Sequence, residues 1–128
     1  MRLLLDTHTF IWWDSEPAKL SPKMLALCQN PDNELILSVA SLWEMQIKAQ
    51  LGKMKLIMPL AHLIESQQKT NNLQLLSVRA PHVLELSSLP SLHKDPFDRL
   101  LIAQARIENL RMATQDSIIR DYPVQVVW

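Results

Sequence analysis

The sequence predicts an α/β fold with a mainly parallel central sheet. Short apolar segments alternate along the chain with longer segments whose apolar residues have helical spacing, as expected when helices connect parallel strands. The apolar segments are nearly continuous, as in Leu3–Leu5, which is typical of strands that are buried on both faces. The 128 residues are the length of one domain and contain no repeat or linker, so we expect a single domain over residues 1–128.

Five short segments have the apolar composition of strands and are bounded by polar or turn residues. Asp6 directly follows the first of them, Thr114 follows the fourth, and Tyr122-Pro123 precedes the last. The predicted strands, in chain order, are Arg2–Leu5, Leu35–Leu37, Leu73–Val78, Arg111–Ala113 and Val124–Val127.

The helices are placed mainly by their capping residues. At Ser21-Pro22 and at Asp95-Pro96, a favoured N-cap residue precedes the proline that is favoured at the first helical position. Ser38 or Ser41 caps another helix, and Gly52 follows its end, where glycine is preferred. The predicted helical segments are a turn over Phe10–Trp13 and helices from Pro22 to about Asn30, from Ser38 or Ser41 to Leu51, and over Leu60–Lys69, Pro81–Leu86 and Pro96 to about Asn109.

The composition excludes several classes of function. Thirteen basic and thirteen acidic side chains give no net charge, so a partner held by bulk electrostatics is not indicated. Gly52 is the only glycine, which excludes glycine-rich phosphate loops, and Cys28, the only cysteine, is expected in the core. The run Leu3–Leu5 is too short for a signal sequence and no apolar run could span a membrane, so we expect a cytoplasmic protein.

Four acidic residues are predicted to converge at one edge of the sheet. Asp6 and Asp116 follow predicted parallel strands, which end at the same edge. Glu44 lies in the first two turns, and Asp98 in the first turn, of helices that begin there. Carboxylates that lie close together repel one another and need a cation, and an oxygen-only ligand set favours Mg²⁺ or Mn²⁺. Such an ion can activate water and neutralise a phosphodiester, so the arrangement favours phosphodiester hydrolysis.

Each acid also has a purely structural explanation. Asp6 can accept hydrogen bonds from nearby backbone N–H groups, and Asp116 can cap a short helix. Glu44 precedes Lys48 by four residues, the spacing of an exposed helical ion pair. Asp98 occupies the third position of its helix, where the acid of a capping box bonds back to the N-cap backbone.

Four sequence blocks occur in a recognisable order over nearly the whole chain: DTHTFIWW, SVASLWEMQIKAQLGK, LPSLHKDPFDRLLIAQA and TQDSIIRDYPVQVVW. Together they resemble the PIN-domain family, and within it VapC-type ribonuclease toxins of bacterial toxin–antitoxin pairs. The resemblance implies a three-layer PIN-like fold with helices flanking the sheet, dependence on Mg²⁺ or Mn²⁺, cleavage of RNA, homodimers and inhibition by a cognate antitoxin. It places the family's acidic quartet, which would bind the metal and serve catalysis, on Asp6, Glu44, Asp98 and Asp116.

Residues beside these acids are candidates for supporting roles. Thr7 and Thr114 match polar positions of the family and are expected to orient the carboxylates or a bound water, although a threonine can also simply fill a strand end. Lys48 and Arg99 are candidates for contacts with RNA phosphates, because such contacts dominate nucleic-acid affinity. The alternative for both is a solvated surface position.

Histidines and tryptophans near the acids receive weaker assignments. His8 and His93 have the chemistry to transfer a proton, but water activated by a metal needs no histidine base, so neither is assigned a catalytic role. Trp12, Trp13 and Trp43 have the chemistry to stack on bases, yet packing against helices or a partner explains Trp12 and Trp13 better.

The primary prediction is a metal-dependent endoribonuclease that acts as the toxin of a type II toxin–antitoxin pair. The alternative is a catalytically silent PIN-like module that binds RNA or a protein, which an incomplete quartet would favour; the two are distinguished by whether Mg²⁺ enables cleavage and EDTA stops it. A phosphatase of the haloacid-dehalogenase type also begins with an aspartate after a strand. That chemistry requires a second acid two residues later, where this chain has His8.

Overall fold

The computed structural model describes residues 1–128 and contains one five-stranded sheet in which every pair of neighbouring strands is parallel. The prediction of a mainly parallel sheet is confirmed. In spatial order, the strands are β3 (Gln74–Leu76), β2 (Glu34–Ser38), β1 (Arg2–Leu5), β4 (Arg111–Ala113) and β5 (Val126–Val127).

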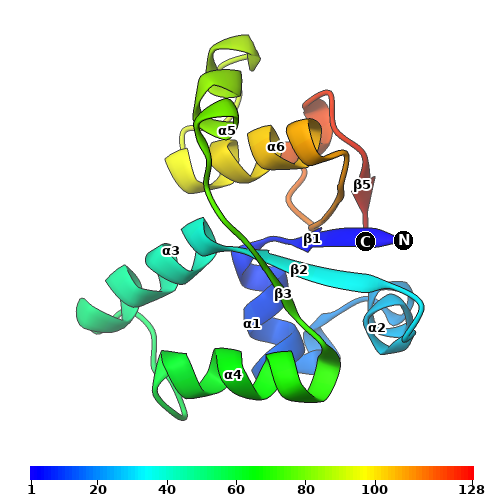
Figure 1. Cartoon of the computed structure of the whole chain (residues 1–128), viewed down its shortest axis with the longest axis vertical. Helices are drawn as coiled ribbons and strands as arrows, with labels where there is room; N and C mark the ends of the chain where they lie inside the picture. Colours follow the sequence, from blue (N-terminus) through cyan, green and yellow to red (C-terminus); the bar gives the residue numbers. More distant parts are fainter.

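Helices cover both faces of this sheet, which gives the three layers of a PIN-like fold (Figure 1). On one side lie α1 (Thr7–Ser15), α2 (Pro22–Gln29) and α4 (Leu60–Asn71), and on the other lie α5 (Ala80–Glu85) and α6 (Pro96–Glu108). The remaining helix, α3 (Val39–Gln50), continues directly from β2 and contacts both α1 and α6. Three single turns of 3-10 helix complete the chain: η1 (Pro17–Lys19), η2 (Leu86–Ser88) and η3 (Ile119–Asp121).

The apolar core is divided between the two faces of the sheet. Leu3 and Leu5 pack in one buried cluster, while Leu4 packs in the other, because successive side chains of a strand point to opposite faces. Leu37 and Ile36 in β2 are divided in the same way. Both faces of the central strands are therefore buried, which explains why these strands are continuously apolar in the sequence.

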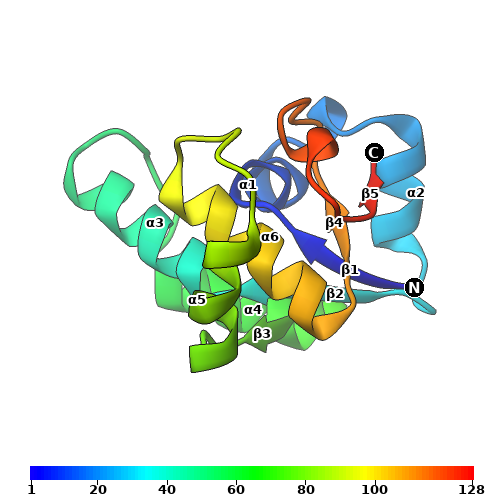
Figure 2. The ribbon, with the colours of Figure 1, turned by 90° about the horizontal axis from the view of Figure 1, so that it is seen from above.

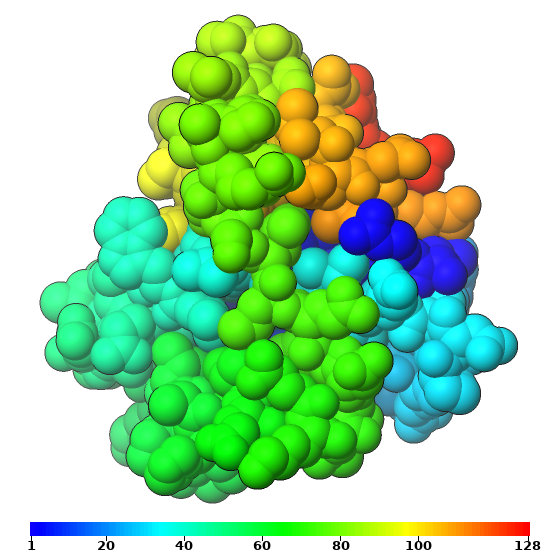
Figure 3. All heavy atoms as spheres, in the orientation of Figure 1, coloured from blue at the N-terminus to red at the C-terminus, as the bar shows by residue number.

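The carboxyl ends of the central strands are the edge where several helices begin. Asp6 follows β1 and precedes α1 without any intervening loop, and Ser38 links β2 to α3 in the same way. Figure 2 shows the N-terminal end of α6 on the same side of the molecule as the tip of β1. Figure 3 shows a face of the molecule other than this edge, and the residues of α4, β3 and α5 form a continuous band over it.

The edge strands are shorter than predicted. β3 spans Gln74–Leu76 instead of Leu73–Val78, and β5 spans Val126–Val127 instead of Val124–Val127. Each edge strand has only one neighbour, so its length is set by the few residues that find a register partner there.

Two helical predictions also need correction. The turn expected over Phe10–Trp13 is a full helix that starts at Thr7, because Asp6 caps its first turn. The structural alternative for Asp116, a short helix capped by it, is only the 3-10 turn η3. The predicted N-cap residues are confirmed: at α3 the cap is Ser38, whose hydroxyl accepts the backbone N–H of Ala40.

Cys28 is buried in the core cluster on the α2 side of the sheet, as predicted. Burial raises the pKa of its thiol to about 11, since the thiolate would have to lose its hydration. No helix of the protein combines the length and the apolar character that crossing a bilayer requires.

Candidate active site

Asp6 joins the end of β1 to the start of α1. Its Oδ1 accepts the backbone N–H of Thr9 at 2.7 Å, which caps the helix. The backbone N–H of Asp6 and the hydroxyl of Thr9 both donate to the carbonyl of Ala113 at the end of β4, at 3.2 and 3.0 Å. The expected structural role of Asp6 is therefore real, but it uses one carboxylate oxygen and leaves the other without a protein partner.

Glu44 is buried in α3 and has both carboxylate oxygens engaged. The hydroxyl of Thr7 donates to Oε1 at 2.7 Å, and Nζ of Lys48 lies 3.0 Å from Oε2. The predicted ion pair with Lys48 is present, but it is not an exposed surface pair, because the Glu44 side chain is only 7% exposed. Ser41 lies 3.0 Å from the Thr7 hydroxyl and completes this buried polar group.

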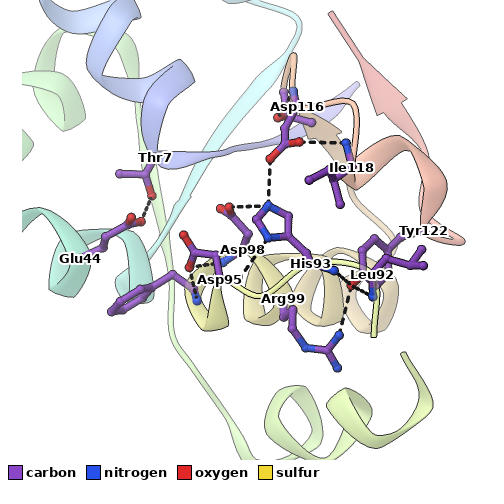
Figure 4. Close-up of polar contacts among 12 residues, drawn as sticks. Thr7, Glu44, Leu92, His93, Asp95, Asp98, Arg99, Asp116, Ile118 and Tyr122 are labelled. Carbon is purple, nitrogen blue, oxygen red and sulfur yellow. Dashed lines mark hydrogen bonds and ion pairs between the residues drawn. The ribbon is translucent and has the colours of Figure 1, made fainter. Parts of the chain in front are cut away.

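Asp98 and Asp116 meet at the imidazole of His93 (Figure 4). Nε2 of His93 lies 3.1 Å from Oδ2 of Asp98 and 3.0 Å from Oδ2 of Asp116. The other oxygen of Asp116 accepts the backbone N–H of Ile118 at 2.9 Å. One histidine thus connects the start of α6 with the loop that follows β4.

The start of α6 differs in one respect from a capping box. Asp95 is the N-cap, as predicted, and its Oδ1 accepts the backbone N–H of Phe97 at 2.8 Å. However, the backbone N–H of Asp95 donates to Nδ1 of His93 at 3.1 Å, and Asp98 does not bond back to it. The capping-box explanation of Asp98 is therefore wrong, and the Asp98 carboxylate is directed at His93.

Three of the four predicted acids line one open hollow at the carboxyl edge of the sheet. Glu44 does not line this hollow, but it is hydrogen-bonded to Thr7, the neighbour of Asp6, and its negative charge helps to raise the pKa of Asp98. The lining residues are Asp6, His8, Thr9, Trp12, Asp98, Gln115, Asp116 and Ser117.

The electrostatics of the hollow differ between its carboxylates. Burial, followed by the negative charge of Asp95, raises the pKa of Asp98 to about 7, and the charges of Asp6 and Glu44 act in the same direction against an opposing effect of His93. Burial also acts to raise the pKa of Asp116, but hydrogen bonds from His93 and Ile118 outweigh it and lower the pKa. Asp98 is therefore the carboxylate of the hollow whose ionised form is least favourable.

The donor set of the hollow fits a hard divalent cation. The side chains of Asp6, Asp98 and Asp116 offer carboxylate oxygens, the ligand type preferred by Mg²⁺ and Mn²⁺. The raised pKa of Asp98 indicates a place where added positive charge would be favourable. Nε2 of His93 and one oxygen each from Asp98 and Asp116 also lie within 4.8 Å of one another.

The predicted supporting residues occupy different surroundings. Thr7 bonds to Glu44, and Oγ1 of Thr114 accepts the backbone N–H of Asp116 at 3.0 Å, so each contacts one of the predicted acids. Arg99 does not contact the acids: Nη1 donates to the carbonyl of Pro90 at 2.8 Å and to the hydroxyl of Tyr122 at 3.1 Å. This geometry favours a role for Arg99 in holding the loop before α6, and its contact with substrate remains a prediction.

Sequence reasoning undervalued several residues around the hollow. The sequence gives no clear signal for a role of His93, which bridges two of the acids, or of Thr9 and Tyr122. The only available signal was the position of His93 five residues before Asp98 in the HKDPFDR block. Nothing in that spacing reveals which way the loop turns.

The tryptophans are divided between the hollow and its surroundings. Trp12 lines the hollow and packs edge-to-face against Trp128, with ring centroids 6.1 Å apart. Trp13 packs in the same manner against Phe10. Trp43 is 62% exposed and lies edge-on to Phe97. Of the three candidates for base stacking, only Trp12 therefore lines the acidic hollow.

The fold and the hollow define a parallel α/β protein with an acidic site at the carboxyl edge of its sheet. The chain belongs to the PIN domain family, whose family model matches residues 3–125. It is 31% identical to Ribonuclease VapC22 of Mycobacterium tuberculosis over 124 aligned residues. The alignment covers 94% of this chain and 91% of that protein.

Solved structures share the same fold. One is the structure of VapBC2 from Rickettsia felis bound to a promoter DNA fragment. One of its chains superposes with a TM-score of 0.76 at 18% identity, and the match covers 100% of this chain and 99% of that one. A chain of VapBC-1 from nontypeable Haemophilus influenzae gives a TM-score of 0.63 at 20% identity, covering 99% and 97%. At these identities the likeness establishes the fold.

Proposed function

We propose that this protein is a Mg²⁺- or Mn²⁺-dependent endoribonuclease that hydrolyses RNA phosphodiester bonds, and that it is the toxin of a type II toxin–antitoxin pair. The observation that carries the proposal is the gathering of Asp6, Asp98 and Asp116 around one open hollow, with Glu44 beside them. The 31% identity to a protein named as a ribonuclease supports the choice of RNA as substrate.

In this proposal, the four acids form the metal site, and three of them are direct ligands. The free oxygen of Asp6 and the carboxylates of Asp98 and Asp116 would be direct ligands, while Glu44 lies beside them in a position set by Thr7 and Lys48. When bound, the ion activates water near neutral pH and offsets negative charge on the phosphodiester.

The remaining polar residues keep these carboxylates in place. Thr9 and Ala113 fix Asp6 between β1 and β4, Thr114 and Ile118 fix Asp116, and the Asp95 cap fixes the first turn of α6. Backbone groups of β4, of the loop that follows it and of the first turn of α6 take part in these contacts. Such support matters because a metal site requires its ligands to be held close together against their mutual repulsion.

Water can reach the scissile phosphate because the hollow is open to solvent. Its volume is about 450 Å³, and its walls beyond the acids are formed by Trp12, His8, Gln115 and Ser117. That space accommodates a phosphate together with an adjacent nucleotide and water. Lys48, one turn from Glu44, is the candidate cation for a second phosphate of the strand, and Arg99 is the weaker candidate because the loop uses its donors.

The proposal also includes two protein partners, a cognate antitoxin and a second copy of this chain. Support for the antitoxin comes from the solved neighbours, which are named as VapBC assemblies. A small apolar pocket of about 40 Å³ between α1 and the segment after α3, lined by Phe10, Met45, Met54 and Leu63 among others, has room for no more than one apolar side chain of such a partner. Co-purification with the product of a neighbouring gene and light scattering of the free chain measure the two partnerships separately.

The nuclease proposal is tested with purified protein and fluorescent single-stranded RNA. We expect cleavage with Mg²⁺ or Mn²⁺, no cleavage with EDTA, and loss of at least about two orders of magnitude in rate for Asp6→Asn and Asp98→Asn, as for removal of a catalytic-metal ligand. Asp32→Asn is the matched control, because Asp32 is exposed in the turn before β2. Cleavage by Asp98→Asn at the wild-type rate would contradict the assignment, and no cleavage by any form would favour the silent binding module.

A further inference from the structure

We propose that His93 is a positioning residue: its Nε2–H donates a hydrogen bond to Asp116 and lies at ion-pair distance from Asp98, which holds the two acids together, and His93 is not a ligand of the metal. This inference rests on the proposed function, since it concerns the same metal site. Its physical basis, however, is the hydrogen bonding of the chain itself.

The imidazole makes one hydrogen bond and one close approach to the acids. Nε2 is hydrogen-bonded to Asp116 Oδ2 at 3.0 Å, and it lies 3.1 Å from Asp98 Oδ2, within ion-pair distance. The His93 side chain is 14% exposed, so these contacts are largely shielded from water. In Figure 4, Asp98 and Asp116 approach the ring from two directions and converge on the same nitrogen.

The position of the ring proton follows from the other nitrogen. The backbone N–H of Asp95 points at Nδ1 from 3.1 Å, and a backbone amide can only donate. Nδ1 must therefore present its lone pair, which places the proton of the neutral imidazole on Nε2. A nitrogen that carries a proton has no lone pair for a metal, so this tautomer makes Nε2 a donor to carboxylates and excludes it as a ligand.

The loop that carries His93 is anchored independently of the acids. The hydroxyl of buried Tyr122 accepts the backbone N–H of His93 at 2.8 Å and that of Leu92 at 3.1 Å. Arg99 donates to the same hydroxyl at 3.1 Å and to the carbonyl of Pro90 at 2.8 Å. Because its backbone is held from α6 and from the η3 region, the imidazole reaches the acids in a fixed orientation.

This arrangement reduces the repulsion between neighbouring carboxylates in the site before a cation binds. Two carboxylates that approach closely repel one another and favour moving apart. An N–H donor placed beside Asp98 and Asp116 compensates part of that repulsion without occupying a position on the metal. Residues that orient ligands in this way typically change metal affinity by about 10–100-fold when they are removed.

The test compares His93→Ala and His93→Gln in the full-length protein. Glutamine keeps an N–H donor on a side chain of similar reach, whereas alanine removes the donor. His62→Gln is the matched control, because His62 is exposed on α4. Mn²⁺ affinity is measured without RNA from the electron paramagnetic resonance signal of the free ion, and the imidazole tautomer of the metal-free protein is read from ¹⁵N nuclear magnetic resonance.

We expect wild type and His62→Gln to bind Mn²⁺ equally, His93→Ala to bind about 10–100-fold more weakly, and His93→Gln to recover most of that loss. The ¹⁵N spectrum should show the proton on Nε2, and the bound Mn²⁺ should show no coupling to a directly bonded imidazole nitrogen. A proton on Nδ1, such a coupling, or equal weakening by the two His93 variants would overturn the positioning role while leaving the metal site intact. Absence of Mn²⁺ binding by the wild type would instead overturn the proposed metal-dependent function and this role with it.

Discussion

The hydroxyl of Thr7 donates a 2.7 Å hydrogen bond to Oε1 of Glu44, which joins the first residue of α1 to the second turn of α3. Both side chains are buried, and Lys48 takes the remaining oxygen of Glu44. The two helices start from neighbouring strands of the sheet, β1 and β2. The Thr7 hydroxyl thus fixes the position of Glu44 relative to the carboxyl edge of the sheet.

Thr7→Val should destabilise the protein by about 1–3 kcal/mol, because valine keeps the shape of threonine but leaves a buried carboxylate oxygen without its donor. Urea unfolding followed by circular dichroism measures this change. Thr7→Ser is the matched control, since serine retains the hydroxyl, and it should lose less stability than the valine variant. Equal losses in the two variants would show that the methyl group matters and that the hydrogen bond to Glu44 does not.

Metal binding should release a proton from Asp98 in a pH-dependent manner. Burial and the charge of Asp95 raise the pKa of Asp98 to about 7, so the free protein holds this proton below that pH, and a cation bound to the carboxylate must displace it. We expect release of about one proton at about pH 6, close to none at about pH 8, and tighter binding as the pH rises. Titration calorimetry in buffers of different ionisation enthalpy measures the release, and Asp98→Asn should abolish its pH dependence.

Tyr122→Phe should loosen the loop before α6. The substitution removes an oxygen that accepts the backbone N–H groups of Leu92 and His93 and one Arg99 donor, leaving them without this partner at a cost of about 1–3 kcal/mol. Amide hydrogen exchange should accelerate at Leu92 and His93 by more than at the central strand β1. Unchanged exchange at these two amides would mean that the hydroxyl does not anchor the loop.

Cys28 should be almost unreactive in the folded protein. Its thiol is buried, which raises its pKa to about 11, and only the thiolate is an effective nucleophile. Alkylation by iodoacetamide at mildly alkaline pH should therefore be slow in buffer and fast in concentrated urea, as measured by mass spectrometry. Cys28→Ala provides the blank, and fast labelling of the folded wild type would show that the α2 side of the core opens readily.

The parallel sheet was predictable because its signal is local and strong. The central strands are continuously apolar because both of their faces are covered by helices. That pattern can be recognised in Leu3–Leu5 without knowing which strands lie beside it. The extent of the edge strands was not predictable, because their ends depend on which residues find a register partner. The start of α1 was missed because Thr7 and Thr9 have low helix propensity, which the cap at Asp6 overrides.

The candidate site was predictable only in part. Acids that follow parallel strands must come to one edge, so the approach of Asp6 to Asp116 could be expected from topology alone. The contacts of His93 and Arg99 could not, because they depend on how the loop before α6 turns back on itself. Asp98 illustrates the difference: its place in the helix was correct, but its supposed bond to the Asp95 backbone is taken by His93.

The central claim is that acids at the sheet edge hold a metal that activates water to cleave RNA, and the chemistry of the product ends tests it most directly. Attack by water leaves linear phosphate ends, whereas a metal-independent ribonuclease that uses the ribose 2′-hydroxyl leaves 2′,3′-cyclic phosphates. Mass spectrometry of the products should show only linear ends, formed with Mg²⁺ or Mn²⁺ and absent with EDTA or with Asp98→Asn. Cyclic phosphate ends, or cleavage that survives EDTA, would contradict the account.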